Sequence, residues 1–305
     1  MKLLTFLVEG VNRLGVKTEQ GIIDVEAALA VVTYSGEISR TIHEVIAGGT
    51  EAVSALQSFV DQALVEAEAK SGKGNYLLDE KAITYGPCVT HPNKIICVGL
   101  NYRKHAEETN AAIPEYPILF NKFNNTLCGN GADIAIPRVT EKVDYEAELV
   151  IVIGKKAKYV SKEDALSHVF GYCNVNDLSA RDLQLRTQQW LLGKTCDDFS
   201  PLGPYLVTAD EVGNPNDLTI KCTINGEVRQ NSNTSDMIFP CNEIVSYISQ
   251  HFTLVPGDII LTGTPQGVVL GYPKDKQVWL KDGDIMTIEI EKLGALTNRM
   301  VAEPV

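Results

Sequence analysis

The chain has no C-x-x-C pair, although its 305 residues include seven cysteines. An odd number of scattered cysteines excludes a disulfide framework and the usual zinc and redox spacings, so we expect free thiols in a reducing compartment. No apolar run reaches the roughly 18 residues of a membrane-spanning helix. The N-terminus meets a charge at Glu9, too early for the core of a signal peptide. These absences predict a cytoplasmic protein that does not bind membranes.

Basic residues are also scarce: 27 Lys and Arg stand against 39 Asp and Glu, a formal net charge of −12. Binding to nucleic acid regardless of its sequence needs clustered cations, so this balance argues against that class. The motifs G-x-S-x-G and G-x-G-x-x-G are missing, which removes support for a serine hydrolase or a Rossmann enzyme. A small anion can still bind where local cations or a metal outweigh the overall charge.

The pattern of the chain predicts a strand-rich α+β protein. Residues 1–85 are expected to form a small N-terminal α+β domain, with a helix over 51–70, and residues 86–93 a linker. Residues 94–305 are expected to form the main domain, which has helices over 180–190 and 241–252. Its expected strands are 94–98, 147–153, 171–176, 218–224, 227–230, 258–262 and 284–291. The Asn225-Gly226 pair predicts a hairpin between two of them.

Two carboxylates, Glu146 and Glu148, open the strongly apolar segment that continues through residue 153. Strand alternation sends both acids to one face and places Leu149 and Ile151 on the other. If both faces are buried, two ionised acids there require a cation, and a divalent metal is the natural one. The alternative is that burial begins only after Glu148, which leaves both acids in solvent. This motif alone supports a buried metal site and two solvent-exposed acids equally.

A third acid, Asp177, ends the strand expected over 171–176 and precedes the expected helix. An acid in this position can reach a ligand, but Asp is also a common helix cap. Ser179 is available for that capping instead, with Asp182 three residues on. The helix would carry Arg181, Gln184 and Gln188 in a polar row, which is more often a solvent-exposed face than a site.

His105 and Glu108 follow the strand expected over 94–98 and share one face of a helical turn. A carboxylate beside an imidazole fixes its tautomer and raises its basicity, as the activation of water near neutral pH requires. A lone surface His beside a Glu is more often inert than catalytic.

Lys194 and Thr264 are two further candidates. The small and apolar neighbours of Lys194 favour an oriented, partly buried amine over the usual surface lysine. Thr264 lies in a Gly-rich turn after the strand expected over 258–262, where backbone amides and its hydroxyl are available to a substrate carboxylate.

Together, these motifs resemble the fumarylacetoacetate hydrolase family over roughly residues 94–303, and they occur in the family's order. The matching segments are Gly99-Leu100-Asn101-Tyr102 with His105 and Glu108, Glu146-x-Glu148, Asp177-x-x-x-Arg181-x-x-Gln184, Lys194, Asn225-Gly226-Glu227-Val228-Arg229-Gln230 and Thr262-Gly263-Thr264-Pro265. The resemblance implies a strand-rich mixed β-roll, usually assembled as a homodimer.

The resemblance also implies the roles of the candidate residues. The ligands of a Mg²⁺ or Mn²⁺ ion would be Glu146, Glu148 and Asp177. The catalytic groups would be His105, Glu108 and Lys194, the first two on a lid that orders over the substrate. The substrate contacts would be Tyr102, Arg181, Gln184 and Thr264. Three carboxylates suit a hard octahedral cation better than zinc, in agreement with this assignment.

One departure from the family pattern narrows the resemblance. The eukaryotic-type fumarylacetoacetase has a further acidic ligand shortly before its catalytic His, whereas the segment before His105 offers Asn101 and no acid. The chain is therefore more similar to the shorter branch, which contains acylpyruvate hydrolases, oxaloacetate decarboxylases and dienedioate isomerases.

We expect a metal-dependent hydrolase that cleaves a carbon–carbon bond of 2,4-dioxo acids such as acylpyruvates or fumarylacetoacetate. Water activated by His105 would attack the distal carbonyl, and the metal and Lys194 would hold the departing pyruvate enolate. Decarboxylation of oxaloacetate and isomerisation of a dienedioate use the same metal-held enolate and stay open as alternatives. A non-catalytic metabolite sensor is less favoured, because it would not need the base. The expected partner of each enzyme is a small anionic 2-oxo acid.

Overall fold

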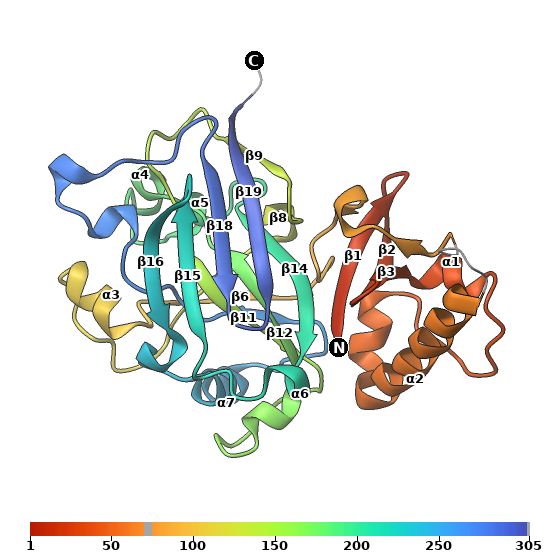
Figure 1. Ribbon diagram of the computed structural model, residues 1–305. Helices are drawn as coiled ribbons and strands as arrows, with labels where there is room; N and C mark the ends of the chain where they lie inside the picture. The colour runs from red at the N-terminus through yellow and green to blue at the C-terminus, as the bar shows by residue number, and fades with distance from the viewer. Residues whose placement is uncertain (70–74, 304–305) are drawn as a thin grey trace.

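The computed structural model describes residues 1–69 and 75–303. Its largest sheet has twelve strands, ten of them in one continuous path (Figure 1). The spatial order of that path is β4 (Leu77–Leu78), β3 (Gly21–Asp24), β2 (Val11–Thr18), β1 (Lys2–Val8), β14 (Ser200–Thr208), β12 (Val169–Asn176), β11 (Ala147–Ile153), β17 (Ile259–Leu261), β6 (Ile95–Gly99) and β7 (Ile118–Lys122). The other two strands are β5 (Thr84–Tyr85) beside β1 and β8 (Leu127–Cys128) beside β14.

A second sheet of five strands packs against β11, β12 and β14 of the large sheet. Its order is β16 (Glu227–Asn233), β15 (Thr219–Ile224), β18 (Ile285–Ile290), β19 (Gly294–Ala302) and β9 (Asp133–Ile136). A short ribbon pairs β10 (Val143–Asp144) with β13 (Ser179–Ala180). The predicted hairpin at Asn225-Gly226 joins β15 to β16, and both residues have positive φ, as a tight two-residue turn requires.

Helices are short apart from two. They are α1 (Val25–Leu29), α2 (Ile42–Ala69), α3 (Arg103–Glu108), α4 (Arg181–Gln184), α5 (Leu191–Lys194), α6 (Ala209–Val212) and α7 (Cys241–His251). Among the described residues, 3₁₀ turns lie at Glu80–Ala82, Asn124–Thr126, Ala165–His168, Thr234–Asp236, Val269–Gly271 and Lys274–Lys276. In the described part of the chain, no helix has the length and apolar character needed to cross a membrane. The predicted strand-rich α+β class is confirmed.

The N-terminal region adds strands to the main sheet, because β1 runs antiparallel beside β14 (Figure 1). The helix α2 begins nine residues before the position expected from the sequence and bends at Gly49, whose φ of 57° and ψ of −140° are not helical. Lys70, the expected last residue of that helix, lies outside the described residues. The division of the chain into residues 1–85, a linker over 86–93 and residues 94–305 stays a prediction.

The prediction of one continuous helix over 180–190 is wrong. The chain forms a short helix at α4, continues without helical structure, and forms a second short helix at α5. A Cβ added to Gly193 would lie 2.4 Å from the Gln184 nitrogen and 2.6 Å from the Ala180 oxygen, so only glycine permits this close return. Ser179 does not cap the helix: the capping position belongs to Ala180, and the Ser179 hydroxyl donates to the Asp177 carbonyl at 3.1 Å.

The sequence did not predict β14, a strand of nine residues. This strand is buried along its whole length, yet it contains Pro201, Gly203 and Pro204, and proline and glycine inside a segment argue against a central strand. Its neighbours β1 and β12 come from segments far away in the chain. No local pattern could therefore have revealed this pairing.

Candidate metal centre and active site

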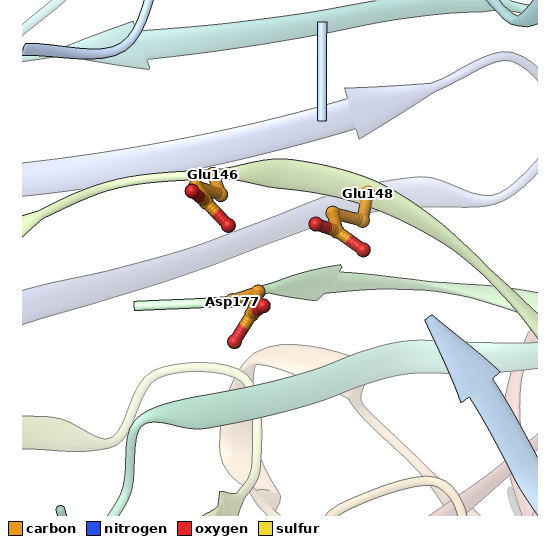
Figure 2. A group of neighbouring side chains, drawn as sticks. All are labelled: Glu146, Glu148 and Asp177. Carbon is orange, nitrogen blue, oxygen red and sulfur yellow. The ribbon is translucent and has the colours of Figure 1, made fainter. Parts of the chain in front are cut away.

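Three carboxylates converge where β11 starts and β12 ends (Figure 2). Glu146 directly precedes β11, Glu148 is its second residue, and Asp177 directly follows β12. The two strands are antiparallel, with Ala147 opposite Asn176, so the start of one lies beside the end of the other. One oxygen from each of the three acids lies within 4.8 Å of the others, and all three acids are buried. The structure thus brings together the three predicted metal ligands.

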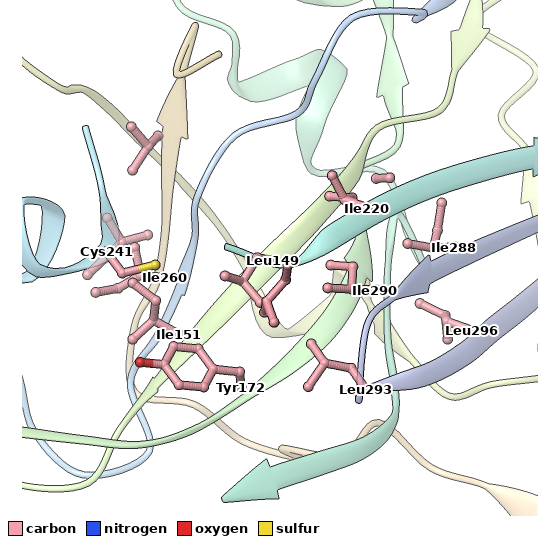
Figure 3. Close-up of a cluster of buried hydrophobic side chains, with 14 of the residues drawn as sticks. Leu149, Ile151, Tyr172, Ile220, Cys241, Ile260, Ile288, Ile290, Leu293 and Leu296 are labelled. Atoms are coloured by element: carbon pink, nitrogen blue, oxygen red, sulfur yellow. The ribbon is translucent and has the colours of Figure 1, made fainter. Parts of the chain in front are cut away.

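The strand that carries two of these acids is fixed by packing on both faces. Leu149 and Ile151 belong to the hydrophobic cluster under the second sheet (Figure 3), whereas Val150 and Val152 belong to a separate cluster that includes residues of α2. All seven residues of β11 are buried. Burial therefore begins before Glu148, which excludes the alternative of two solvent-exposed acids.

Lys194 lies between two of the acids. Its Nζ is 2.7 Å from Glu146 Oε2 and 2.7 Å from Asp177 Oδ2, and its side chain is 2% exposed. Burial would lower the pKa of Lys194, but Asp177 and Glu146 raise it above its ordinary value. The ammonium group therefore stays charged at neutral pH, in agreement with the buried amine expected from the sequence.

Arg181 is the second cation that binds the acid cluster. Its Nε donates to Asp144 Oδ2 at 2.8 Å, its Nη2 to Glu146 Oε1 at 2.7 Å, and its Nη1 to Gln184 Oε1 at 2.9 Å. Burial alone would raise the pKa of Glu146, whereas Lys194 and Arg181 outweigh it and lower the pKa to about 2. Of the predicted polar row, Arg181 and Gln184 are buried at the site, whereas Gln188 lies beyond the end of α4 and is exposed.

Glu148 differs from its neighbours because no cation in the described residues forms an ion pair with it. Its Oε2 accepts a hydrogen bond of 2.8 Å from the Gly263 nitrogen. Burial, followed by the charges of Asp177 and Glu146, raises the pKa of Glu148 well above its ordinary value. A buried acid with two acidic neighbours favours a further cation. Because the donors are all carboxylate oxygens, the group fits Mg²⁺ or Mn²⁺ better than zinc.

Metal binding is expected to weaken as the pH falls. The pKa of Glu148 is raised well above its ordinary value in the metal-free protein, and a protonated carboxyl must lose its proton before it binds a metal. The dissociation constant for Mn²⁺ should therefore increase as the pH falls, by up to about tenfold per pH unit where Glu148 takes up its proton. Titration calorimetry in two buffers with different ionisation heats will show release of a proton. Equal affinity at all pH values at which the protein stays folded, with no proton release, would contradict this assignment.

The predicted His105–Glu108 pair forms on α3. His105 Nδ1 lies 2.8 Å from Glu108 Oε1, and Glu108 Oε2 accepts a hydrogen bond of 2.9 Å from the Gly267 nitrogen. His105 is 7% exposed, so it is not the solvent-exposed histidine that the sequence left open. Because Nδ1 is used by Glu108, Nε2 is the ring nitrogen available to a ligand.

One cavity of about 200 Å³ unites these groups. It is lined by the three acids, Lys194, Arg181, Gln184, His105 and Thr264, and on its apolar side by Val98, Leu100, Phe120, Leu185, Trp190 and Leu270. Trp190 packs edge-to-face on Phe120 with ring centroids 5.4 Å apart. The volume is below the roughly 300–1,000 Å³ of pockets for drug-sized ligands, so a small acid is the fitting occupant.

Of the predicted substrate contacts, Tyr102 does not lie at the cavity, and Thr264 lies there with its hydroxyl already bonded. Tyr102 is fully buried in the hydrophobic core and does not line the cavity, because it precedes α3 and packs inward. Thr264 does line the cavity, but its hydroxyl donates to the Ala147 carbonyl at 2.9 Å and accepts from Gln230 Nε2 at 2.9 Å. Its hydrogen is therefore already used, and binding a carboxylate would require the hydroxyl to exchange partners.

Sequence reasoning missed two charged residues of this site. Lys122 ends β7, and its Nζ lies 2.5 Å from Asp177 Oδ1, but nothing near it in the sequence points to Asp177. Asp144 had a signal, because it lies two residues before Glu146 and continues the alternation of the acids. It is fully buried and anchors Arg181.

Comparisons with known proteins agree with this geometry. Residues 94–301 match the family model described as fumarylacetoacetate hydrolase C-terminal. The mitochondrial oxaloacetate tautomerase of Xenopus laevis is 41% identical over 293 residues, which cover 95% of this chain and 86% of the relative. The fumarylacetoacetate hydrolase of Exiguobacterium antarcticum superimposes with a TM-score of 0.79 at 32% identity, covering 99% of this chain and 100% of that chain. Maleylpyruvate hydrolase from Sphingobium sp. SYK-6, solved with manganese(II) and pyruvate, gives a TM-score of 0.77 at 28% identity over the whole of both chains.

These relatives contradict the cytoplasmic location expected from the sequence, because the Xenopus laevis protein and several other curated relatives are mitochondrial. The cytoplasmic expectation rested on free thiols, which occur in the reducing interior of both the cytoplasm and the mitochondrion and do not separate the two. The family expected from the motifs is confirmed on both sequence and structure. The chain belongs to the fumarylacetoacetate hydrolase family of enzymes.

Proposed function

We propose that this enzyme interconverts the enol and keto forms of oxaloacetate, or of a similarly short 2-oxo dicarboxylic acid, with the help of a divalent cation. The observation that carries the proposal is one small cavity lined by a buried acid cluster, a fixed ammonium group and His105, whose ring is held by Glu108. The similarity to the Xenopus laevis oxaloacetate tautomerase supports this chemistry over the carbon–carbon hydrolysis expected from the sequence.

Tautomerisation needs only proton transfer between oxygen and carbon. The proton of the enol hydroxyl leaves C2–OH, and a proton is added at C3, which gives the ketone and balances the charge. His105 Nε2 is the group in this cavity suited to carry that proton, because Glu108 fixes Nδ1 and the Gly267 nitrogen fixes Glu108. The apolar side of the cavity excludes bulk water from the intermediate.

The negative charge of the enolate needs a preorganised counter-charge. The residues that would hold a divalent cation are Glu146, Glu148 and Asp177, and the bound ion would supply Lewis-acid stabilisation of the enolate oxygen. Lys194 adds a buried ammonium group whose position is fixed before the substrate arrives. Arg181 keeps Glu146 ionised and oriented.

A second candidate is hydrolysis of a short acylpyruvate, with His105 activating water instead of transferring a proton to carbon. The likeness to maleylpyruvate hydrolase, solved with manganese(II) and pyruvate, favours it. Decarboxylation of oxaloacetate is a third outcome of the same enolate chemistry and requires no base.

Replacing His105 with Ala separates these reactions. Ketonisation of enol oxaloacetate should fall by about 10²–10⁴-fold, the usual contribution of a general acid–base, while metal affinity stays unchanged. His43→Ala, at a histidine that does not line the cavity, is the matched control and should retain full activity. Turnover is followed by the loss of enol absorbance, and release of carbon dioxide is followed in parallel. Full ketonisation by His105→Ala would overturn the assigned role of the dyad.

A further inference from the structure

The pair of His105 and Glu108 rests on a loop from a distant part of the chain, residues 267–271. Glu108 Oε2 accepts a hydrogen bond of 2.9 Å from the Gly267 nitrogen, while Oε1 lies 2.8 Å from His105 Nδ1. Gly271 lies directly against the same carboxylate, because a Cβ added to this glycine would be 2.5 Å from Glu108 Cδ. The position of the 267–271 loop therefore determines where the Glu108 carboxylate lies.

Asp144 holds the middle of that loop. Its Oδ1 accepts from the Val269 nitrogen at 2.8 Å, and its Oδ2 accepts from the Leu270 nitrogen at 3.0 Å. The same two oxygens also accept from the Tyr145 nitrogen at 2.9 Å and from Arg181 Nε at 2.8 Å. Asp144 is fully buried and does not line the cavity, so any effect that it has on the reaction passes through other residues.

We infer that Asp144 is a positioning residue for the proton-transfer pair. It fixes the 267–271 loop to Arg181, and the loop in turn fixes the carboxylate of Glu108. Glu108 then orients His105, whose Nε2 is the atom assigned to proton transfer. This inference rests on the proposed function and adds a residue, outside the cavity, on which its rate depends.

The arrangement requires a carboxylate, because a carboxylate accepts hydrogen bonds through both oxygens and an amide through only one. In Asp144→Asn, the NH₂ group must face either the Val269 or the Leu270 nitrogen, since one of these lies at each oxygen of the parent side chain. Two donors then face each other, and the loop loses a hydrogen bond whichever way the amide turns. A displacement of about 1 Å in a positioned group can lower a rate by about 100-fold.

Two further variants complete the test. Gly271→Ala displaces Glu108 directly, because the added Cβ would meet the flexible end of that side chain while Asp144 keeps its own contacts. Asp258→Asn is the matched control. Asp258 is also fully buried and outside the cavity, and its Oδ2 accepts from one lysine at 2.9 Å and from one backbone nitrogen at 2.8 Å.

The experiment measures kcat and KM for enol oxaloacetate, and the affinity for Mn²⁺, in the parent protein and the three variants. Asp144→Asn and Gly271→Ala should each lower kcat by about 10–100-fold and change KM and the Mn²⁺ affinity much less. Asp258→Asn should keep the kcat of the parent. In a double-mutant cycle, adding Asp144→Asn to Glu108→Ala should cost little further activity, because both changes act through the same carboxylate.

A spectroscopic signal reports on the same contact without turnover. The proton on His105 Nδ1, which lies 2.8 Å from Glu108 Oε1, should give a downfield proton NMR resonance that is identified by its loss in His105→Ala. We expect this resonance to persist in Asp258→Asn and to shift or broaden in Asp144→Asn.

The outcomes separate this inference from the function on which it rests. If the parent protein does not ketonise oxaloacetate, the proposed function is overturned; a changed NMR signal in Asp144→Asn still supports the positioning role, and an unchanged signal overturns it. Normal kcat in folded Asp144→Asn, a loss of Mn²⁺ affinity as large as the loss of kcat, or full additivity with Glu108→Ala also overturns it. If Asp144→Asn does not fold, an unchanged kcat in Gly271→Ala overturns it.

Discussion

Glu148→Gln is expected to abolish metal-dependent turnover and, at the same time, to raise the thermal stability of the metal-free protein. The loss of activity should exceed the roughly 10–100-fold effect of changing an outer-shell partner, because a direct ligand is removed. The gain in stability follows because Glu148 is buried beside two acids without an ion-pair partner among the described residues, which raises its pKa well above the ordinary value. An acid whose pKa is higher in the folded than in the unfolded protein makes the fold less stable as the pH rises above the unfolded pKa.

A glutamine removes that cost and still presents an oxygen to the Gly263 nitrogen. The test is the midpoint of thermal unfolding in the presence of a chelator, together with kcat/KM at saturating Mg²⁺. Glu163→Gln, at an exposed glutamate away from the cavity, is the control and should change neither quantity. Glu148→Gln with normal turnover would remove Glu148 from the metal ligands. An active-site acid that costs stability is the expected trade between function and folding.

Lys194→Met should show the opposite effect on stability. Removal of the ammonium group leaves Glu146 and Asp177 buried without one of their cations, and breaking a buried ion pair in this way costs about 3–5 kcal/mol. Turnover should fall by about 10²–10³-fold, as for the loss of one preorganised group that stabilises an oxyanion. Metal affinity should be retained or increase, because Nζ no longer competes for Glu146 Oε2 and Asp177 Oδ2.

Three measurements on one variant make this prediction specific. The unfolding free energy of metal-free Lys194→Met should be lower than that of the parent protein. Saturating Mg²⁺ should raise the unfolding free energy of the variant by more than it raises that of the parent. The value of kcat should fall while metal affinity is retained or increases. Lys194→Arg, which keeps the charge, should recover part of the stability. Loss of metal binding together with loss of activity would instead show that Lys194 is needed to assemble the ligand set.

The signs of both predictions follow from the charge balance of the site. The buried acids are Asp144, Glu146, Glu148 and Asp177, and the buried cations are Lys122, Arg181 and Lys194. Arg181 pairs with Asp144 and Glu146, Lys194 pairs with Glu146 and Asp177, and Lys122 pairs with Asp177. Glu148 is left without an ion pair among the described residues. A change that removes the unpaired acid therefore stabilises the metal-free protein, and a change that removes a paired cation destabilises it.

Local alternation predicted that Glu146 and Glu148 share a face at the start of β11, although it left open whether the two acids are buried. The period of two in a strand fixes which side chains share a face, and this property depends only on neighbouring residues. The His105–Glu108 contact was predictable for the same reason, because three residues span less than one helical turn. The family's motif order added Asp177 and Lys194, which no local pattern joins to Glu146.

The remaining features depend on contacts between distant segments. Lys122 lies 55 residues from Asp177, and only the pairing of β7 at the edge of the sheet brings its side chain inward. The interruption between α4 and α5 depends on the close return of Gly193, which a helical pattern in residues 180–190 does not reveal. Tyr102 shows the reverse problem, because motif order placed it at the substrate and packing placed it in the core.

The central claim is metal-dependent tautomerisation, and one parallel assay tests it directly. The full chain is given enol oxaloacetate and acetylpyruvate, each with Mg²⁺, with Mn²⁺ and with excess chelator. Loss of the enol, release of carbon dioxide and formation of pyruvate are recorded together. We predict rapid metal-dependent ketonisation of oxaloacetate that the chelator abolishes, with slower cleavage of acetylpyruvate and slower release of carbon dioxide. Rapid cleavage of acetylpyruvate without ketonisation, or ketonisation that survives the chelator, would contradict this account.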